Sequence, residues 1–156
     1  MMAPAAPPGG SPLGEHPFLR GLDPEFLRAL QPLARSREFA TGDHLVREGD
    51  VAESLHLILA GKVALELVNA ERPRLTVQTL GPGEVLGWSW LVPPHRWRFD
   101  ARALKPTRTW AIEAAGLRAL LEARPEQGYR FLLRLLPVVA ERLEHTRIQL
   151  MDIYAP

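Results

Sequence analysis

The hydrophobic and polar positions divide the chain into segments with different periods. Between residues 36 and 113, short apolar or alternating runs recur between turn signals spaced roughly ten residues apart. The runs are HLV (44–46), LHLILA (55–60), VALELV (63–68), LTVQTL (75–80), FDARAL (99–104) and TWAIE (109–113). Regularly spaced short strands are typical of an all-β sandwich or jelly roll. In the run 63–68, alternation predicts a strand with one buried face.

Helical patterns flank this strand region on both sides. Before it, Asp23 is a candidate N-cap and Pro24 suits the first position of a helix, and apolar residues follow at helical spacing. After it, residues 114–123 predict a short helix. A long helix is predicted from Pro125 toward the end of the chain, with a kink at Pro137, whose ring meets the carbonyl one turn earlier.

The second half of this long helix carries an apolar stripe. Its positions follow a three-four spacing and are Leu136, Val139, Leu143, Thr146, Leu150 and Ile153. Such a stripe is typical of a helix seam between two chains, and it also suits a helix that lies along its own barrel. We favour a homodimer, because an apolar stripe near the end of the chain needs a partner. The predicted interface is Leu136, Val139, Leu143, Leu150 and Ile153.

Composition excludes several classes of function. The chain has 156 residues, the size of one domain, and its net charge of +1 provides no basic field to attract nucleic acid. Without cysteine it has no thiolate chemistry and no cysteine zinc site. The Pro-, Gly- and Ala-rich residues 1–14 predict a flexible tail rather than a signal peptide, and no apolar run reaches the ~20 residues that cross a bilayer. We expect a cytoplasmic protein without membrane contact.

No pattern of catalytic or metal-binding residues is visible. The histidines are scattered, without a His-x-His pair or a suitably spaced glutamate, at His16, His44, His56, His95 and His145. No Gly-x-Ser-x-Gly elbow, Walker motif or spaced carboxylate pair occurs. The sequence therefore predicts a protein that is not an enzyme and holds no metal.

Three motifs resemble one known family. They are REGDVAESLHLILAGKVAL (47–65), LGPGEVLGW (80–88), and ARAL (101–104) followed by TWAIE (109–113). Together with the order of elements, they resemble the cyclic nucleotide-binding domain, the fold of the catabolite activator protein and of kinase regulatory subunits, from His16 to Ile153. The resemblance implies a mainly β jelly-roll, or double-stranded β-helix, barrel with an N-terminal helix over residues 15–124. It also implies that the helix over residues 125–156 is a dimerisation element.

The resemblance places the family's phosphate-binding cassette between residues 86 and 98. The candidate ligand-binding residues are Leu86, Gly87, Trp88, Ser89, Trp90, Arg96, Trp97 and Arg98. In members that bind ligand, a tight glycine admits the phosphate to backbone N–H groups, a glutamate accepts from the ribose hydroxyl, and an arginine binds the phosphate. Here Trp88 stands at the glutamate position and Trp97 at the arginine position, unless loop 92–95 shifts the register and brings Arg96 or Arg98 to the phosphate. Two lost polar partners would weaken cAMP or cGMP by roughly two to four decades.

The resemblance implies a stand-alone regulatory or sensor domain that dimerises through its last helix and signals to a protein partner. In that mechanism, a ligand would pull the turn at residues 87–91 inward and the long helix would repack. The alternative is a scaffold of the same fold, with a tryptophan-filled pocket, used for protein contacts. Transcription factors of this fold carry a helix-turn-helix after the long helix, and this chain stops at Pro156, so we expect no direct nucleic-acid binding. We also expect Trp90 in the core and Arg102 exposed on its strand.

Overall fold

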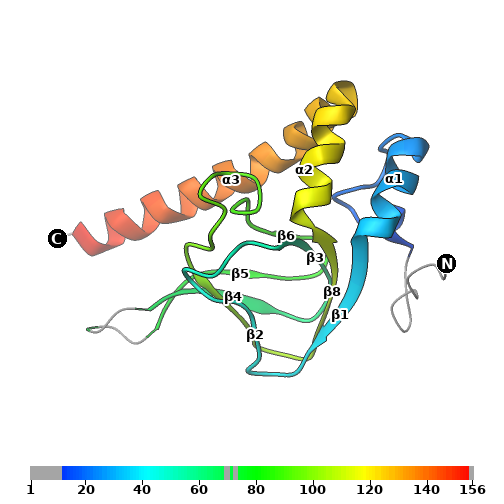
Figure 1. The fold of residues 1–156 in the computed structure, drawn as a ribbon. Helices are drawn as coiled ribbons and strands as arrows, with labels where there is room; N and C mark the ends of the chain where they lie inside the picture. Colours follow the sequence, from blue (N-terminus) through cyan, green and yellow to red (C-terminus); the bar gives the residue numbers. More distant parts are fainter. Residues whose placement is uncertain (1–11, 69–70, 72–73, 155–156) are drawn as a thin grey trace.

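Two antiparallel four-stranded sheets face each other and enclose the hydrophobic core (Figure 1). The computed structural model describes residues 12–68, 71 and 74–154. The strand orders are β1-β8-β3-β6 in one sheet and β2-β7-β4-β5 in the other. This arrangement confirms the predicted jelly-roll barrel with flanking helices.

The elements follow one another as the sequence patterns predict, with two additions. The strands are β1 (Ala34–Phe39), β2 (His44–Val46), β3 (Ser54–Ala60), β4 (Val63–Leu67), β5 (Leu75–Leu80), β6 (Val85–Leu86), β7 (Asp100–Ala103) and β8 (Thr107–Glu113). The helices are α1 (Pro24–Leu30), α2 (Ala114–Ala123) and α3 (Pro125–Tyr154), with 3-10 helices η1 (Leu13–Glu15) and η2 (Gln31–Leu33). Each predicted run matches a strand to within two residues. The runs did not include β1, whose sequence ARSREF is mostly polar, or β6, which has two residues.

The first helix begins where its capping residues predict. The Asp23 carboxylate accepts a hydrogen bond from the Phe26 backbone N–H at 3.1 Å, and Pro24 occupies the first helical turn. Phe26 and Leu30 are fully buried, and the ring of Phe26 meets that of Phe131 on α3. Most of the tail predicted at residues 1–14 lies outside the described residues, and Leu13, near its end, is buried in η1.

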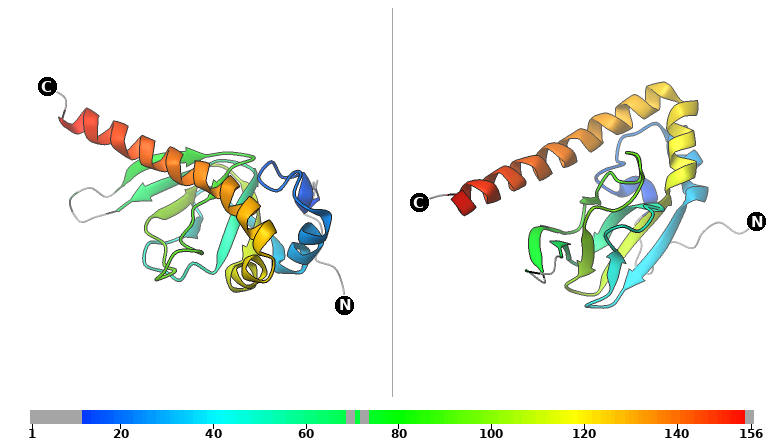
Figure 2. Two further views of the ribbon diagram at one scale, coloured as in Figure 1. Left: turned by 90° about the horizontal axis from the view of Figure 1, so that it is seen from above. Right: turned by 60° about the vertical axis from the view of Figure 1, so that its left-hand side comes forward.

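Helix α3 crosses the top of the barrel from α2 toward the side of β4 and β5 (Figures 1 and 2). Its first half is anchored by Phe131 and Leu135, which are buried. Pro137, where a kink is predicted, lies inside this helix, which continues without a break from Pro125 to Tyr154. Within the part of the chain that the structure describes, no helix combines the length and the apolar character needed to cross a membrane.

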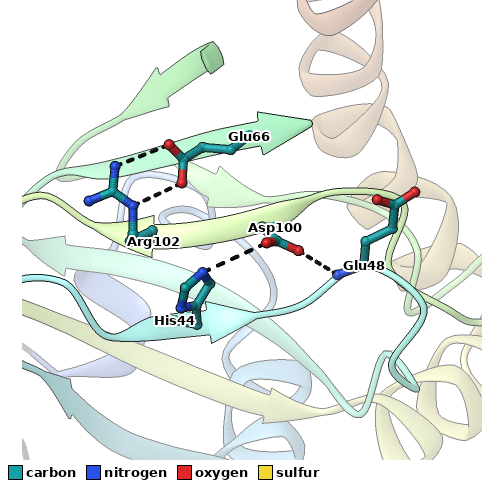
Figure 3. A network of polar contacts seen from close by, with 5 residues as sticks. All are labelled: His44, Glu48, Glu66, Asp100 and Arg102. Atoms are coloured by element: carbon teal, nitrogen blue, oxygen red, sulfur yellow. Dashed lines mark hydrogen bonds and ion pairs between the residues drawn. The ribbon is translucent and has the colours of Figure 1, made fainter. Parts of the chain in front are cut away.

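A buried ion pair lies on the face of β4 and β7 that points away from the core (Figure 3). Glu66 is only 2% exposed, and Nε and Nη2 of Arg102 donate to its two carboxylate oxygens at 2.9 and 3.0 Å. The predictions of simple alternation in β4 and of an exposed Arg102 are therefore wrong. Charge pairing across neighbouring strands explains the difference, because each side chain covers the other. Leu67, which the alternation places on the same face as the buried Val63 and Leu65, is exposed.

The same hydrogen bonds fix the ionisation of Glu66. Donation from Arg102 lowers the pKa of the Glu66 carboxyl below its usual value. Next to the pair, the Asp100 carboxylate accepts from the Glu48 backbone N–H at 2.8 Å and lies 3.7 Å from His44 Nε2 (Figure 3). These contacts join β2, β7 and β4 on one surface.

We predict that Glu66→Gln destabilises the fold by about 1–3 kcal/mol at pH 7, because the Arg102 guanidinium loses its partner. A carboxyl with a lowered pKa contributes stability above its unfolded pKa of about 4.3, and the contribution is lost as the pH falls through the folded value. The difference between wild type and Glu66→Gln in urea unfolding should therefore shrink below about pH 4.

The matched control is Glu126→Gln, which removes one charge from the exposed i,i+4 pair with Arg130 on α3. We expect a change below about 0.5 kcal/mol. A Glu66→Gln effect as small as the control's, or one that is independent of pH, would contradict the structural importance of the buried pair.

Candidate functional site

The predicted cassette forms a tight turn after β6. Gly87 follows Leu86 with φ of +69°, in the left-handed region that favours glycine. The backbone N–H groups of Leu91 and Val92 then donate to the Trp88 carbonyl at 2.9 and 3.2 Å, which closes a single turn. The chain therefore has the shape of a cassette turn, and its side chains decide what the turn can bind.

Aromatic rings cover the glycine of this turn. A Cβ at Gly87 would lie 3.0 Å from Cζ3 of Trp97 and 3.3 Å from Cζ of Phe99. Trp97 is 3% exposed, and its ring packs against Phe99 with centroids 5.8 Å apart. These rings therefore pack against Gly87 on the side where a Cβ would project, and the turn is covered there by aromatic side chains.

The two candidate arginines do not lie over Gly87. Arg96 is exposed, and its Nη1 donates to the Gly49 carbonyl at 2.8 Å. Arg98 is exposed and lines the cleft, described below, between the cassette turn and α3. The alternative register, in which one of them replaces the family's arginine, is not observed, because Trp97 lies against Gly87.

Trp90 connects the cassette turn to the helices. It is fully buried, as expected for a core residue, and its indole Nε1 donates to the Gly87 carbonyl at 3.3 Å. Its ring meets Phe131 of α3 edge to face, with centroids 6.0 Å apart. Arg118 of α2 donates to its carbonyl oxygen. A displacement of the turn would therefore also displace Phe131, in the first half of α3.

A cleft of about 480 Å³ lies between the cassette turn, the β4–β5 side of the barrel and the second half of α3. Most of its walls are apolar. The lining residues are Leu67, Leu75, Val77, Trp88, Ser89, Arg98, Phe99, Arg142, Thr146, Gln149, Leu150, Asp152 and Ile153. Of the predicted ligand-binding residues, the cleft brings together Trp88, Ser89 and Arg98. Leu86, Gly87, Trp90, Arg96 and Trp97 do not line it.

Arg142 of α3 is the polar centre of this cleft. Its guanidinium lies 5.1 Å from the ring centroid of Trp88 and 4.7 Å from that of Phe99. Its Nε donates to Oε1 of Gln78 on β5 at 2.9 Å. Burial lowers the pKa of Arg142 to about 10, so the side chain stays protonated at neutral pH.

Sequence reasoning did not select Arg142, because it falls between two positions of the apolar stripe on α3. A signal was nevertheless present in the cassette. Trp88 replaces a glutamate, and a tryptophan face is a good partner for a guanidinium. An arginine on the facing helix could have been sought on that ground.

The predicted stripe on α3 divides between two surroundings. Leu136 and Leu143 are 60% and 61% exposed, and Val139 is half-buried. Leu150 and Ile153 line the cleft and keep exposed fractions of 48% and 62%. Part of the stripe thus turns toward the barrel of its own chain, and the seam between two chains stays a prediction for the positions that face outward.

The buried histidines act as structural groups. His56 Nδ1 lies 3.1 Å from Oγ1 of Thr109, and burial lowers the pKa of His56 to about 4, so it is neutral at pH 7. His16 is bonded to the Ile58 carbonyl and the Phe18 N–H. Among residues 12–68, 71 and 74–154, no group of three histidine or carboxylate side chains is placed to hold a metal.

We predict that Gly87→Ala destabilises the fold more than Gly42→Ala. Both glycines have positive φ, but a Cβ at Gly42 meets nothing within 4 Å, whereas one at Gly87 meets Trp97 and Phe99. Both variants should lose about 1 kcal/mol from backbone strain, and Gly87→Ala should lose a further 1–3 kcal/mol, roughly, from overpacking. Urea unfolding followed by circular dichroism measures the difference. Equal losses would contradict the aromatic cover over Gly87.

Comparison with known proteins identifies the family to which this fold belongs. A family model described as the cyclic nucleotide-binding domain matches residues 36–124. The "CRP-like cAMP-activated global transcriptional regulator" of Mycobacterium tuberculosis is 25% identical over 136 residues, which are 87% of this chain and 59% of that protein. The "Cyclic AMP receptor protein" of Thermus thermophilus is 28% identical over 127 residues, covering 81% and 53% of the two chains. The chain thus spans a little over half the length of these relatives.

A solved structure gives the same result over a whole chain. A protein of Geobacter metallireducens GS-15, assigned to the cyclic nucleotide-binding proteins, superposes with a TM-score of 0.74 and 30% identity. The match covers 85% of this chain and 98% of that one. On the matched family model and this shared fold, the chain belongs to the cyclic nucleotide-binding domain family.

Proposed function

We propose that this protein is a cytoplasmic, non-enzymatic regulatory domain that dimerises through α3 and passes the state of its cleft to a protein partner. One observation carries the proposal. The second half of one helix lines the cleft with Arg142, Thr146 and Gln149, and the same half exposes Leu143 to solvent. Because a helix turns as one body, a ligand that shifts the first set of side chains also shifts the second.

The second half of α3 is held to the barrel lightly enough to move. Besides the contacts of Arg142, its side chains bond to the barrel through Gln149 Nε2, which donates to the Val77 carbonyl at 3.2 Å. The first half is fixed by Phe131 and Leu135 in the core. A segment with few buried contacts beside an anchored one opens at a lower free-energy cost than the fold as a whole.

The cleft offers little to a cyclic nucleotide bound in the family's manner. By the family resemblance, Trp88 stands at the position of the ribose acceptor and Trp97 at that of the phosphate-binding arginine, and Trp97 packs against Gly87. The relatives named for cAMP therefore indicate the ancestry of the fold rather than the ligand of this chain. The proposed domain responds to something other than cAMP or cGMP.

A second candidate function is a scaffold that binds no ligand and serves only in protein contacts. The aromatic cover over Gly87 favours it, because a turn covered by aromatic side chains needs no occupant. The two candidates differ in α3. A scaffold requires one fixed position of the helix, and a regulatory domain requires two.

We predict that Leu143→Glu converts a dimer to a monomer in multi-angle light scattering, because a charge in an apolar seam loses its solvation on association. The matched control is Ile148→Glu. Ile148 is 49% exposed and lies five positions further along, about 140° around the helix axis. It should leave the mass unchanged. A Leu143→Glu protein with the wild-type mass would contradict dimerisation through this stripe.

We further predict no saturable response to cAMP or cGMP at concentrations up to about 1 mM, which corresponds to a binding free energy of about −4 kcal/mol. Tryptophan fluorescence suits the measurement, because Trp88 lines the cleft. Melting temperature provides a second readout. Saturation at micromolar nucleotide would show that the cassette retains its ancestral ligand, and would overturn this part of the proposal.

A further inference from the structure

Arg142 is a half-buried cation whose charge has no protein counter-ion among the described residues. Its contacts are one amide oxygen, on Gln78, and two aromatic faces, those of Trp88 and Phe99. Within the described part of the chain, no carboxylate forms an ion pair with it. Aromatic faces stabilise the guanidinium plane, but they leave its terminal N–H donors free for an acceptor. An arginine in the lining of a cleft, with donors left over, is suited to bind the anionic group of a ligand.

The remaining lining defines the rest of the ligand. Leu67, Leu75, Val77, Leu150 and Ile153 form an apolar wall, and the volume of about 480 Å³ is that of a small-molecule site. Leu67, Leu75, Leu150 and Ile153 remain 39% to 62% exposed, so an apolar body in the cleft would remove a continuous apolar surface from water.

The net charge of the cleft indicates which charge the anionic group of a ligand would carry. Two arginines, Arg98 and Arg142, and one aspartate, Asp152, line it, which leaves a net charge of +1. A monoanion matches this value. A phosphate monoester carries nearly two charges and three acceptor oxygens, and the donors on this side of the cleft are the half-buried Arg142 and the buried Ser89. A carboxylate needs only one guanidinium, which it binds through two parallel hydrogen bonds.

We propose that the cleft binds a small monocarboxylate with an apolar body, such as a medium-chain or aromatic acid, with the carboxylate on Arg142 and the body against the apolar wall. The inference rests on the proposed regulatory function, for which it names the class of effector. Bound there, the acid joins α3 to β5 and the cassette turn, because Arg142, Val77 and Trp88 all contact it.

The test compares decanoate, decan-1-ol and decyl phosphate on the full chain. The three share an apolar chain and differ in the head group, so their relative affinities report on the polar contacts of the head group. We expect decanoate to bind at least about tenfold more tightly than decanol, the contribution of one charge-assisted hydrogen bond, and more tightly than decyl phosphate. Equal affinity for decanoate and decanol, or a preference for the phosphate, would overturn the inference.

Two arginine variants of α3 test whether Arg142 causes the preference for decanoate. Arg142→Met keeps the apolar stem and should abolish the preference for decanoate while decanol still binds. Arg147→Met is the matched control, since Arg147 is an exposed arginine on the same helix, paired with Glu144, and should keep the preference. If Arg142→Met does not fold by circular dichroism, Arg142→Lys replaces it and should reduce the preference without abolishing it. A preference unchanged in either Arg142 variant would refute the assignment.

Hydrogen exchange separates this inference from the proposed function. If decanoate binds and the amides of α3 beyond Pro137 become protected, both stand. If decanoate binds and protection does not change, the ligand class stands and the coupling to α3 is wrong. If decanoate does not bind to a protein that light scattering shows to be dimeric, the ligand class is wrong and dimerisation stands.

Discussion

The contact between Trp90 and Phe131 holds the parts of this molecule together. Phe131 receives the rings of Phe18, Phe26 and Trp90, with centroids 5.1, 6.2 and 6.0 Å away. The N-terminal segment, α1, the cassette turn and α3 therefore meet at one side chain. Both Trp90 and Phe131 are fully buried, and burying large aromatic side chains is among the strongest contributions that single residues make to a core. The positions of the turn and of the last helix depend on this cluster.

Around that cluster, the chain keeps the backbone of a nucleotide cassette and changes its chemistry. The left-handed glycine and the single turn after it remain, while Trp97 and Phe99 cover the glycine and Trp88 turns its face to Arg142. The turn is lined by aromatic side chains, and the cation that faces them, Arg142, lies on the helix rather than on the barrel. The cleft beside this barrel is therefore mostly apolar, and the charge of Arg142 would orient a ligand bound in it.

Sequence reasoning reached the fold because the strand runs, the Asp23 cap and the glycine turns are local features. It also placed Trp90 in the core, where the structure has it. It did not find the pairing of Glu66 with Arg102, because the two are 36 positions apart and only strand register brings them together. It passed over Arg142 for the same reason: the value of that side chain comes from Trp88 and Phe99 on another part of the chain.

The ring of Trp97 over Gly87 has a consequence for how this sequence can change over evolutionary time. Restoring an arginine at position 97 alone would leave a void beside Phe99 and place a charge against aromatic walls before any anion was bound there. Restoring a glutamate at position 88 alone would remove the aromatic face on which Arg142 rests. Each reversion loses stability before it gains a ligand contact. An arginine at position 97 and a glutamate at position 88 would therefore each need matching changes in their aromatic neighbours to be accommodated.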